Sequence, residues 1–222
     1  MNIGDLIIYK DNQLLVLNKP AGIPTQKDKT GDKSLLDLAE IYAKKNLWVT
    51  NRLDRPASGI TIFAKTPTAA AHINELFATR KVEKTYLIAV LKGIKEDQGI
   101  LSHHIKPQSK SNKAKVTDQP IQGSRPGVVE FKKVYELKTY DILKVVSKSG
   151  RHHQIRAQFG HFGFPVKGDV KYGARRSNKD RSIHLHCAAI SITHPISGEK
   201  IVLECRPNNE DPIWAALQNA RD

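Results

Sequence analysis

Cysteine is nearly absent from this sequence, which has only Cys187 and Cys205 among 222 residues. The two lie far apart and neither belongs to a CxxC pair. A disulfide framework and a zinc knuckle therefore have no support, because both need closely spaced or more numerous cysteines. We expect both thiols to be buried.

Long hydrophobic runs are also missing. No stretch approaches the roughly 18 apolar residues that a membrane-spanning helix needs, and the segment Met1 to Asp5 lacks a basic region before an apolar one. Hydrophobic residues make up 39% of the chain, which is low but enough for one substantial core at this length. We therefore expect a soluble, cytoplasmic protein with no membrane partner.

Acidic residues are few relative to basic ones. The chain has 22 Asp and Glu against 36 Lys and Arg, which gives a formal net charge of +14 and a sequence pI near 9.8. Such an excess favours a polyanionic partner, with RNA or DNA foremost. Nothing in the sequence indicates a protein partner, and we expect a monomer.

Several motifs of hydrolytic enzymes are absent. Neither Ser58 nor Ser149 lies in a G-x-S-x-G elbow, and Gly168-Asp169 belongs to no phosphate-binding loop. Acyl transfer and nucleotide hydrolysis therefore have little support.

The nine histidines raise the question of a metal, chiefly His184, His186 and His194 near Cys187. On a strand, residues two apart face the same side, so the first two could both be ligands of one metal ion. No acidic residue stands close in sequence to complete a catalytic site. We favour histidines that are satisfied by neighbours or face RNA, and we expect no metal.

Short apolar runs with alternating or β-branched residues outnumber helical patterns. The segment from Leu6 to Leu17 reads as a hairpin, and a glycine turn at Gly150 precedes a helix. Further strands are expected at residues 60–64, 85–91, 128–136, 141–147, 183–193 and 200–204.

Two other helices have recognisable N-termini. Ser34 with Asp37 three residues later forms a capping-box pattern, and Thr66 with Pro67 suits the start of another helix. A short helix is expected around Pro212. The sequence shows no internal repeat of solenoid length, and no linker divides it. We predict an α+β fold over residues 1–222, a single catalytic domain with a largely antiparallel mixed β-sheet flanked by helices.

Residues 105–127 are polar, basic and nearly free of aromatics or periodicity. We interpret them as a mobile basic insertion. The simpler reading is a solvated loop, and the alternative is an arm that contacts phosphates and becomes ordered on RNA.

An acid between two arginines forms the most informative segment. Asp54 lies between Arg52 and Arg55 in a turn-prone stretch, directly before the apolar run 60–64. Locally, this pattern is more typical of a surface ion pair than of a reactive group. The alternative is that Asp54 is a reactive acid. The distant Arg156 makes this possible, because a buried arginine needs a carboxylate partner and Asp54 is a candidate.

Short motifs follow one another along most of the chain. In this order they resemble the RluA-type family of RNA pseudouridine synthases. Two positions depart from the family pattern, because Asn51 replaces a common histidine and Ala57 a common threonine. The motifs are Leu14 to Gly22; Arg52-Leu53-Asp54 with Ser58-Gly59 and Ala64-Lys65-Thr66; Lys84-Thr85-Tyr86; Gly150 to Arg156; Gly168-Asp169 with Tyr172-Gly173; and Leu185-His186-Cys187 with His194-Pro195.

The resemblance implies a pseudouridine synthase-like fold and a reaction without a cofactor. By the resemblance, Asp54 is the essential carboxylate, acting either on the ribosyl C1′ or on the C2′ proton. Arg156 pairs with it, and Tyr86 lies against the uracil face. Since the first motif begins within twenty residues of Met1, we expect a short form without the S4-type RNA-binding domain of many relatives.

The expected substrate is a structured tRNA or rRNA, from which the target uridine is flipped. We place Arg52 in the space left by the flipped base. Arg55 is assigned to phosphate from its charge alone, and Arg151, His153 and Gln154 to RNA binding. The alternative is a non-catalytic RNA-binding or chaperone protein on the same fold.

Overall fold

The computed structural model describes residues 2–109, 111–147 and 149–219, which form two compact units. Unit 1 comprises Met1–Lys84 and His186–Pro207, and unit 2 comprises Thr85–Leu185 and Asn208–Asp222. Each unit thus uses two separate stretches of the chain. The expectation of one domain over residues 1–222 stays a prediction.

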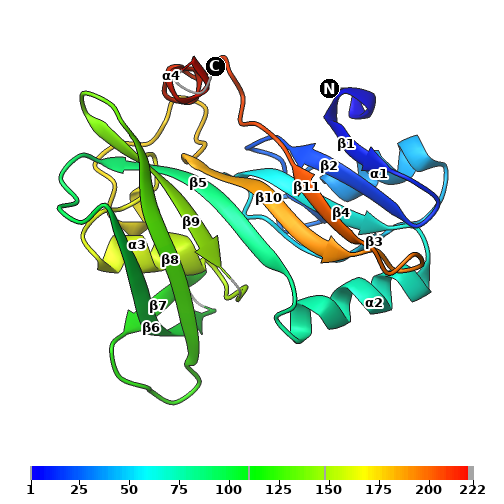
Figure 1. Ribbon diagram of the computed structural model, residues 1–222, viewed down its shortest axis with the longest axis horizontal. Helices are drawn as coiled ribbons and strands as arrows, with labels where there is room; N and C mark the ends of the chain where they lie inside the picture. The colour runs from blue at the N-terminus through cyan, green and yellow to red at the C-terminus, as the bar shows by residue number, and fades with distance from the viewer. Residues whose placement is uncertain (1, 110, 148, 220–222) are drawn as a thin grey trace. The chain divides into compact units, whose positions relative to one another are not determined.

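Unit 1 is built on a mixed sheet in which one pairing among those described is parallel (Figure 1). Its path runs β1-β2-β4-β10, while β11 pairs with β10 and β3 pairs with β4. The parallel pairing joins β4 to β10. The strands are β1 (Ile7–Lys10), β2 (Leu14–Lys19), β3 (Trp48–Val49), β4 (Ser58–Ala64), β10 (Leu185–Thr193) and β11 (Lys200–Glu204).

The helices of unit 1 begin where the capping patterns predict. A short 3-10 helix, η1 (Ile3–Leu6), precedes β1. The helix α1 (Leu35–Ala43) has the complete capping box, with Ser34 and Asp37 each accepting a backbone N–H of the other. The helix α2 (Pro67–Ala78) is capped by the side chain of Thr66. These local starts confirm the predicted helices.

The interior of unit 1 is apolar on both faces of its central strands. The four residues from Leu14 to Leu17 are all fully buried, and Ile60 to Ala64 is equally inaccessible. A strand buried on both faces loses the alternation of polar and apolar residues, which is why β2 and β4 read as continuous runs. The core against α1 contains Ile3, Leu15, Leu17, Leu35, Ala39, Leu47 and Phe63.

The backbones of β4 and β10 approach one another closely at one point. Gly59 has φ +116° and is paired in register with Cys187. A Cβ atom at Gly59 would overlap the carbonyl oxygen and amide nitrogen of Cys187. Glycine is therefore required here by both conformation and space.

Unit 2 contains the remaining strands in the order β5-β9-β8-β6-β7. The β6–β8, β8–β9 and β6–β7 pairs are all antiparallel. Figure 1 shows α3 (yellow) against the β6 and β7 pair. The elements are β5 (Glu83–Leu91), β6 (Gln98–Gln108), β7 (Lys113–Thr117), β8 (Arg125–Glu136), β9 (Tyr140–Ser147), α3 (Gln154–His161), the 3-10 helix η2 (Val170–Tyr172) and α4 (Pro212–Asn219).

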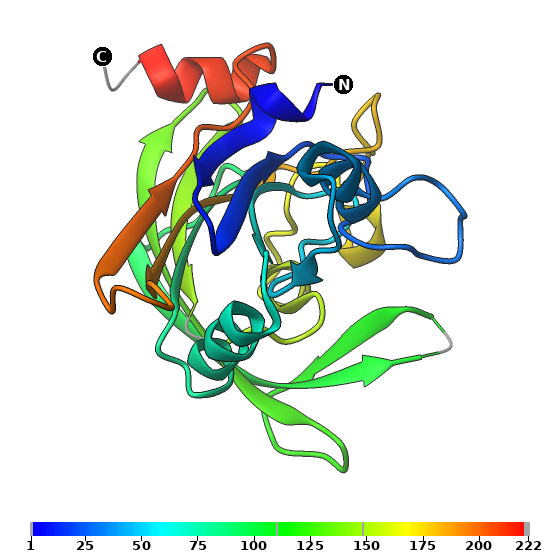
Figure 2. The same cartoon turned by 90° about the vertical axis from the view of Figure 1, so that its right-hand side faces the viewer.

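Residues 105–127 are not the irregular loop that we expected. They contain the end of β6, all of β7 and the start of β8, and Figure 2 shows β6 and β7 as an extended green hairpin. Alternation on β6 and β7 explains the error, because apolar Ile105 and Ala114 pack on Ala157 of α3 while lysines occupy the intervening positions. Lys110 lies outside the described residues, and the mobility of the segment stays a prediction.

The predicted fold class is confirmed: the protein has an α+β fold with a mixed, mostly antiparallel sheet and flanking helices. None of the helices in the described part of the chain has the length and apolar character that a membrane crossing requires. Cys187 is buried as expected, whereas Cys205 is only half-buried.

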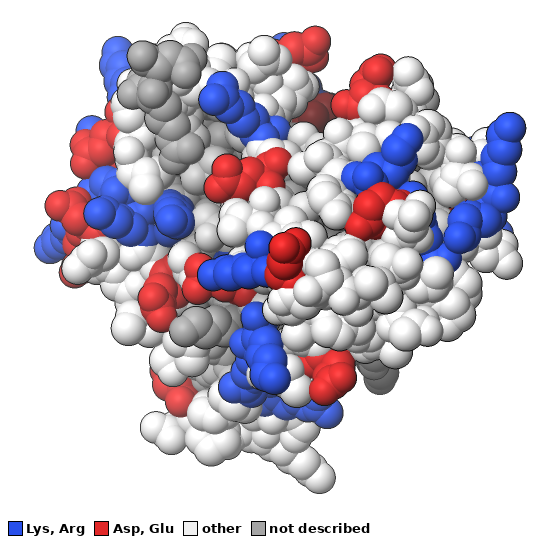
Figure 3. Space-filling view, turned by 45° about the vertical axis from the view of Figure 1, so that its right-hand side comes forward, with Lys and Arg blue, Asp and Glu red and all other residues white. Residues whose placement is uncertain are grey.

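The surface carries basic and acidic side chains side by side. On the face drawn in Figure 3, Lys and Arg (blue) are interspersed with Asp and Glu (red). Exposed ion pairs also occur, such as Lys92 with Glu136 at 3.0 Å. The net positive charge is therefore distributed over this face.

Gly59→Ala tests the close approach of β4 and β10. Because the new methyl group would overlap the Cys187 backbone, we expect the free energy of unfolding to fall by more than about 4 kcal/mol. Gly198→Ala is the matched control, since Gly198 also has a positive φ but open space around it. That control should lose only about 1–3 kcal/mol in chemical denaturation. Equal losses would contradict the steric argument.

Candidate active site

The turn that carries Asp54 is fixed by hydrogen bonds from three directions. The Ala57 N–H donates to the Asp54 carbonyl at 3.0 Å. Thr25 clamps the main chain of Leu53, donating to its carbonyl at 3.1 Å and accepting its N–H at 3.2 Å. Asn51 binds the β4 backbone through both amide atoms, at 3.1 and 2.7 Å. The half-buried Asp54 is thus presented by a rigid turn.

Lys19 lies inside unit 1 near this turn, with no exposed surface. Its Nζ donates to the carbonyls of Pro20 at 2.9 Å and Ile23 at 2.8 Å, and lies 3.3 Å from that of Arg55. Burial lowers the pKa of Lys19 to about 7, while the charge of Asp54 raises it and that of Arg55 lowers it. The lysine thereby ties the end of β2 and the loop that follows it to the turn.

Arg55 points its guanidinium toward the loop between β2 and α1. Its Nε donates to the Gly22 carbonyl at 2.8 Å and its Nη1 to Thr30 Oγ1 at 2.9 Å, and it forms an ion pair with Asp32. Asp28 lies 3.7 Å from Nη1. These contacts give Arg55 a second role as a brace of this loop, and its assignment to phosphate stays a prediction.

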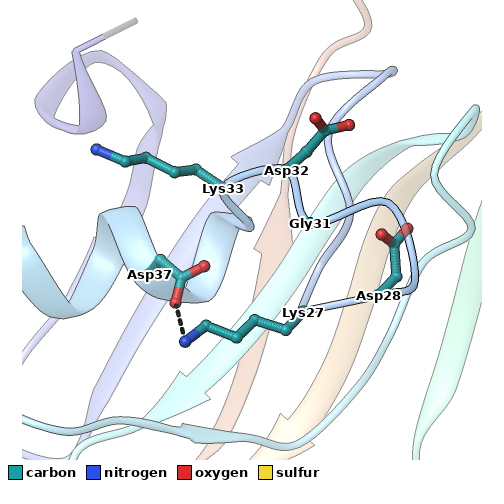
Figure 4. Close-up of a pocket in the computed structure, with 6 residues that line it drawn as sticks. All are labelled: Lys27, Asp28, Gly31, Asp32, Lys33 and Asp37. Atoms are coloured by element: carbon teal, nitrogen blue, oxygen red, sulfur yellow. Dashed lines mark ion pairs between the residues drawn. The ribbon is translucent and has the colours of Figure 1, made fainter.

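The same loop borders an open pocket of about 370 Å³ (Figure 4). Three acids and two lysines line it, and Lys27 pairs with Asp37 at 3.6 Å. The mixed charge offers no concentrated site for an anion. The lining residues are Lys27, Asp28, Gly31, Asp32, Lys33 and Asp37.

Arg52 and Tyr86 occupy different environments. The side chain of Arg52 is exposed beside Asp54 in unit 1, where it can reach a ligand. Tyr86 is half-buried on β5, at the boundary between partly and fully buried residues of that strand. Their roles toward a flipped base and a uracil face stay predictions.

Arg156 is held by a carboxylate that we did not name as its partner. Its Nε donates to Asp169 Oδ2 at 2.6 Å and its Nη2 to Oδ1 at 2.9 Å, which is a bidentate pair. Both side chains are almost fully buried. The guanidinium also lies over the ring of Tyr172 at 5.2 Å. The predicted pairing of Arg156 with Asp54 would join the two units and stays a prediction.

Tyr172 connects α3 to the β6–β7 hairpin. Its hydroxyl accepts the N–H of Ala114 at 2.7 Å and lies 2.9 Å from His153 Nδ1, to which it can donate. His153 stands in the left-handed region at φ 51° and stacks on His152 at 3.8 Å between ring centroids. The buried His153 therefore has a structural partner in addition to any RNA contact.

Gln154 and Arg151 both bind the main chain of unit 2. The Gln154 Oε1 accepts from Ser149 Oγ at 2.9 Å and from the Arg151 N–H at 3.1 Å, and its Nε2 donates to Val128 at 3.3 Å. Arg151 Nε donates to the Pro126 carbonyl at 3.2 Å. These bonds fix the turn before α3, and the assignment of both residues to RNA binding stays a prediction.

The predicted residues fall into two groups. Unit 1 brings Arg52, Asp54 and Arg55 together on one turn, and unit 2 holds Arg151 to Arg156 around α3. Sequence reasoning assigned no role to Lys19, Asp169 or Tyr172. A signal for each existed, because each belongs to a quoted motif whose chemistry went unassigned.

The three histidines that suggested a metal each have other partners. His184 Nε2 lies 3.1 Å from both oxygens of Asp211, and its Nδ1 lies 3.1 Å from the amide nitrogen of Asn178. His194 Nε2 lies 2.7 Å from Asp11 Oδ2. His186 binds Ser58 and the Cys205 carbonyl. Each of these histidines therefore has hydrogen-bond partners within the protein, and the expected absence of a metal stays a prediction.

Among the described residues, another group has the composition of a metal site: His103, Asp118 and His161. The Asp118 carboxylate lies 3.8 Å from His103 Nε2 and 3.3 Å from His161 Nε2. The hydrogen bonds of Gln158 argue against a metal ion at this group. Its Nε2 donates to two backbone carbonyls and lies 3.1 Å from His103 Nδ1, which favours the tautomer with the proton on the atom facing the acid.

Asp169→Asn tests the buried pair with Arg156. The change leaves a buried guanidinium without its counter-charge, so we expect a loss of about 3–5 kcal/mol in the free energy of unfolding. Asp97→Asn is the control, because Asp97 is exposed and pairs with Lys133 at 3.3 Å. It should cost less than about 1 kcal/mol in the same denaturation series. An Asp169→Asn protein with the parent's free energy of unfolding would contradict this expectation.

Lys19→Met tests the burial of a titrating amine. Because the pKa of Lys19 is about 7 when folded and near 10.5 when unfolded, the unfolded chain holds more protons between these values. The stability of the parent relative to Lys19→Met should therefore rise with pH over this interval. Denaturation from about pH 7 to about pH 9 measures it, and a flat or falling difference would contradict the buried amine.

A family model described as RNA pseudouridylate synthase matches residues 13–161. Curated relatives include tRNA pseudouridine synthase C of Vibrio parahaemolyticus, 26% identical over 95% of this chain and 92% of the relative, and that of Haemophilus ducreyi, 28% identical over 96% and 94%. Ribosomal large subunit pseudouridine synthase C of Buchnera aphidicola is 30% identical over 91% and 67%.

Two solved human structures share the fold. RNA pseudouridylate synthase domain containing 4 has a TM-score of 0.79 at 20% identity, covering 98% of this chain and 94% of the other. Domain containing 1 has a TM-score of 0.77 at 24% identity, covering 95% and 86%. Because the family model spans more than half of the sequence and the relatives align along nearly all of it, the chain belongs to the RluA-type family of RNA pseudouridine synthases, enzymes of the isomerase class.

Proposed function

We propose that this protein converts specific uridines of structured tRNA or rRNA into pseudouridine, with Asp54 as the catalytic carboxylate. The observation that carries the proposal is the placement of Asp54 on a turn held by Thr25, Asn51 and the buried Lys19. A preorganised carboxylate loses little entropy in reaching its reacting position. The names of the aligned relatives support tRNA or rRNA as the substrate.

Asp54 has two chemical routes in this proposal. As a nucleophile it attacks C1′ of the ribose and displaces the uracil, and as a base it removes the C2′ proton. Either route leaves the uracil detached so that it can turn and rejoin through C5. Both routes require the ionised form of the carboxylate.

Arg156 and Tyr86 complete the proposed chemistry from unit 2. Arg156 pairs with Asp54 and orients it through its guanidinium, whose plane the bidentate pair with Asp169 fixes. Tyr86 lies against the uracil face and accepts a proton at the final step. No cofactor takes part in this scheme.

The target base must leave its stack before Asp54 can reach the sugar. Flipping costs roughly a few kcal/mol, less for bases in loops than in stems. The exposed Arg52 then occupies the vacated space, where its planar guanidinium can stack on neighbouring bases. This assignment explains why an arginine next to the catalytic acid has an exposed side chain.

RNA binding relies on the distributed positive charge rather than on one pocket. The net charge of +14 favours phosphate contacts, and basic side chains appear across the face in Figure 3. Arg55, Arg151, His153 and Gln154 are the proposed contacts near the turn and α3. We also propose a cytoplasmic monomer.

Asp54→Asn tests the proposed chemistry. The substitution preserves shape but removes the ionised carboxylate, so we expect the rate of pseudouridine formation to fall by at least about 10³-fold. Parent and variant are incubated with tRNA and rRNA from cells that lack the enzyme, and pseudouridine is mapped by sequencing. Folding is checked by circular dichroism.

The control for this assay is Asp97→Asn, which neutralises an exposed acid of unit 2. It should retain the parent rate. An Asp54→Asn protein as active as the parent would contradict the assignment of Asp54 as the catalytic residue. A parent inactive on every structured RNA, yet able to bind it in a salt-sensitive way, would favour the non-catalytic RNA-binding alternative.

A further inference from the structure

A buried histidine ties the start of β4, close to the proposed catalytic acid, to β10. His186 is fully buried, and the parallel pairing of the two strands places it opposite Ser58. Ser58 Oγ lies 2.9 Å from His186 Nδ1. Ser58 stands four residues after Asp54, and Ala57 between them donates its N–H to the Asp54 carbonyl. The histidine is therefore linked to the turn by a short chain of bonds.

The second ring nitrogen fixes the direction of this hydrogen bond. His186 Nε2 lies 3.2 Å from the carbonyl oxygen of Cys205, which can only accept. The proton of the neutral ring therefore resides on Nε2, and Nδ1 accepts from the Ser58 hydroxyl. Burial lowers the pKa of His186 to about 4, which keeps the ring neutral near pH 7.

The link stands at a point where the strands cannot shift freely. Gly59, the next residue of β4, packs its backbone directly against Cys187, and Lys19 of β2 is paired in register with the same glycine. A displacement of Ser58 away from His186 cannot be absorbed there by side chains. It would instead move the turn that ends at Ala57.

We propose that His186 and Ser58 are positioning residues for Asp54. The hydrogen bond from Ser58 to His186 holds the first residue of β4 in place, and the Cys205 carbonyl fixes the ring tautomer that accepts this bond. Neither residue touches the substrate in this account. The inference rests on the proposed role of Asp54 and extends it to the strand behind the turn.

Two substitutions of His186 each remove one of its two hydrogen bonds, either that to Cys205 or that to Ser58. In His186→Asn the amide oxygen can take the place of Nδ1 and accept from Ser58, while the bond to Cys205 is lost. In His186→Gln the amide nitrogen can take the place of Nε2 and keep Cys205, while the bond to Ser58 is lost. Ser58→Ala removes the same bond from the other side, and Ser58→Thr retains the hydroxyl.

We expect Ser58→Ala and His186→Gln to lower kcat by about 10- to 100-fold, because small displacements of a reacting group carry losses of that size. KM for the RNA should stay within about threefold, since the contacts to RNA are not removed. His186→Asn and Ser58→Thr should keep most of the parent kcat. His194→Gln is the control, because it loses the Nδ1 atom that accepts the Ser197 N–H beyond the other end of β10 and should leave kcat unchanged.

A measurement without substrate separates this inference from the proposed function. In the free protein, the backbone amide signals of Leu53, Asp54, Arg55 and Ala57 should shift in His186→Gln and Ser58→Ala but little in His186→Asn. A parent inactive on RNA would contradict the proposed function alone, and the amide signals would still decide the inference. Unchanged signals with kcat within about twofold of the parent, or equal losses in His186→Asn and His186→Gln, would overturn it.

Discussion

The close contact of the β4 and β10 backbones at Gly59 is the constraint on which the site in unit 1 depends. Strands that touch through a glycine cannot slide, so the residues on either side of the contact have fixed positions. Lys19 of β2 is paired in register with this glycine, and Ser58 is the first residue of β4, directly after the Asp54 turn. The rigidity of the turn therefore derives from the sheet, and its hydrogen bonds to Thr25 and Asn51 complete it.

Unit 2 uses a different device for its arginine. Arg156 is fixed by a buried bidentate pair with Asp169 and by the ring of Tyr172, whose hydroxyl in turn reaches His153 and the β6–β7 hairpin. Such pairs contribute orientation more than stability, because desolvation offsets much of their attraction. Unit 2 thus fixes its arginine side chain directly, whereas unit 1 fixes the main chain of the turn that carries Asp54.

Much of the fold was predictable because its signals are local. Capping residues marked α1 and α2, and continuous apolar runs marked β2 and β4, where burial on both faces removes alternation. The β6–β7 hairpin was missed because its outward face is basic and its inward face has only small or scattered apolar residues. The motifs located Asp54 and Arg156, but the partners Lys19 and Asp169 depend on tertiary contacts that spacing does not encode. Asn51 departs from the family pattern and still binds β4.

The central claim is that Asp54 reacts with a uridine rather than supporting a binding surface. RNA carrying 5-fluorouridine at the target position tests this most directly, because its turnover is expected to stall as a slowly dissociating complex. Native gel electrophoresis with the parent and with Asp54→Asn measures the lifetime of that complex at high salt. The account predicts a long-lived complex with the parent that disappears in the variant. Equal, salt-sensitive binding by both proteins would contradict it.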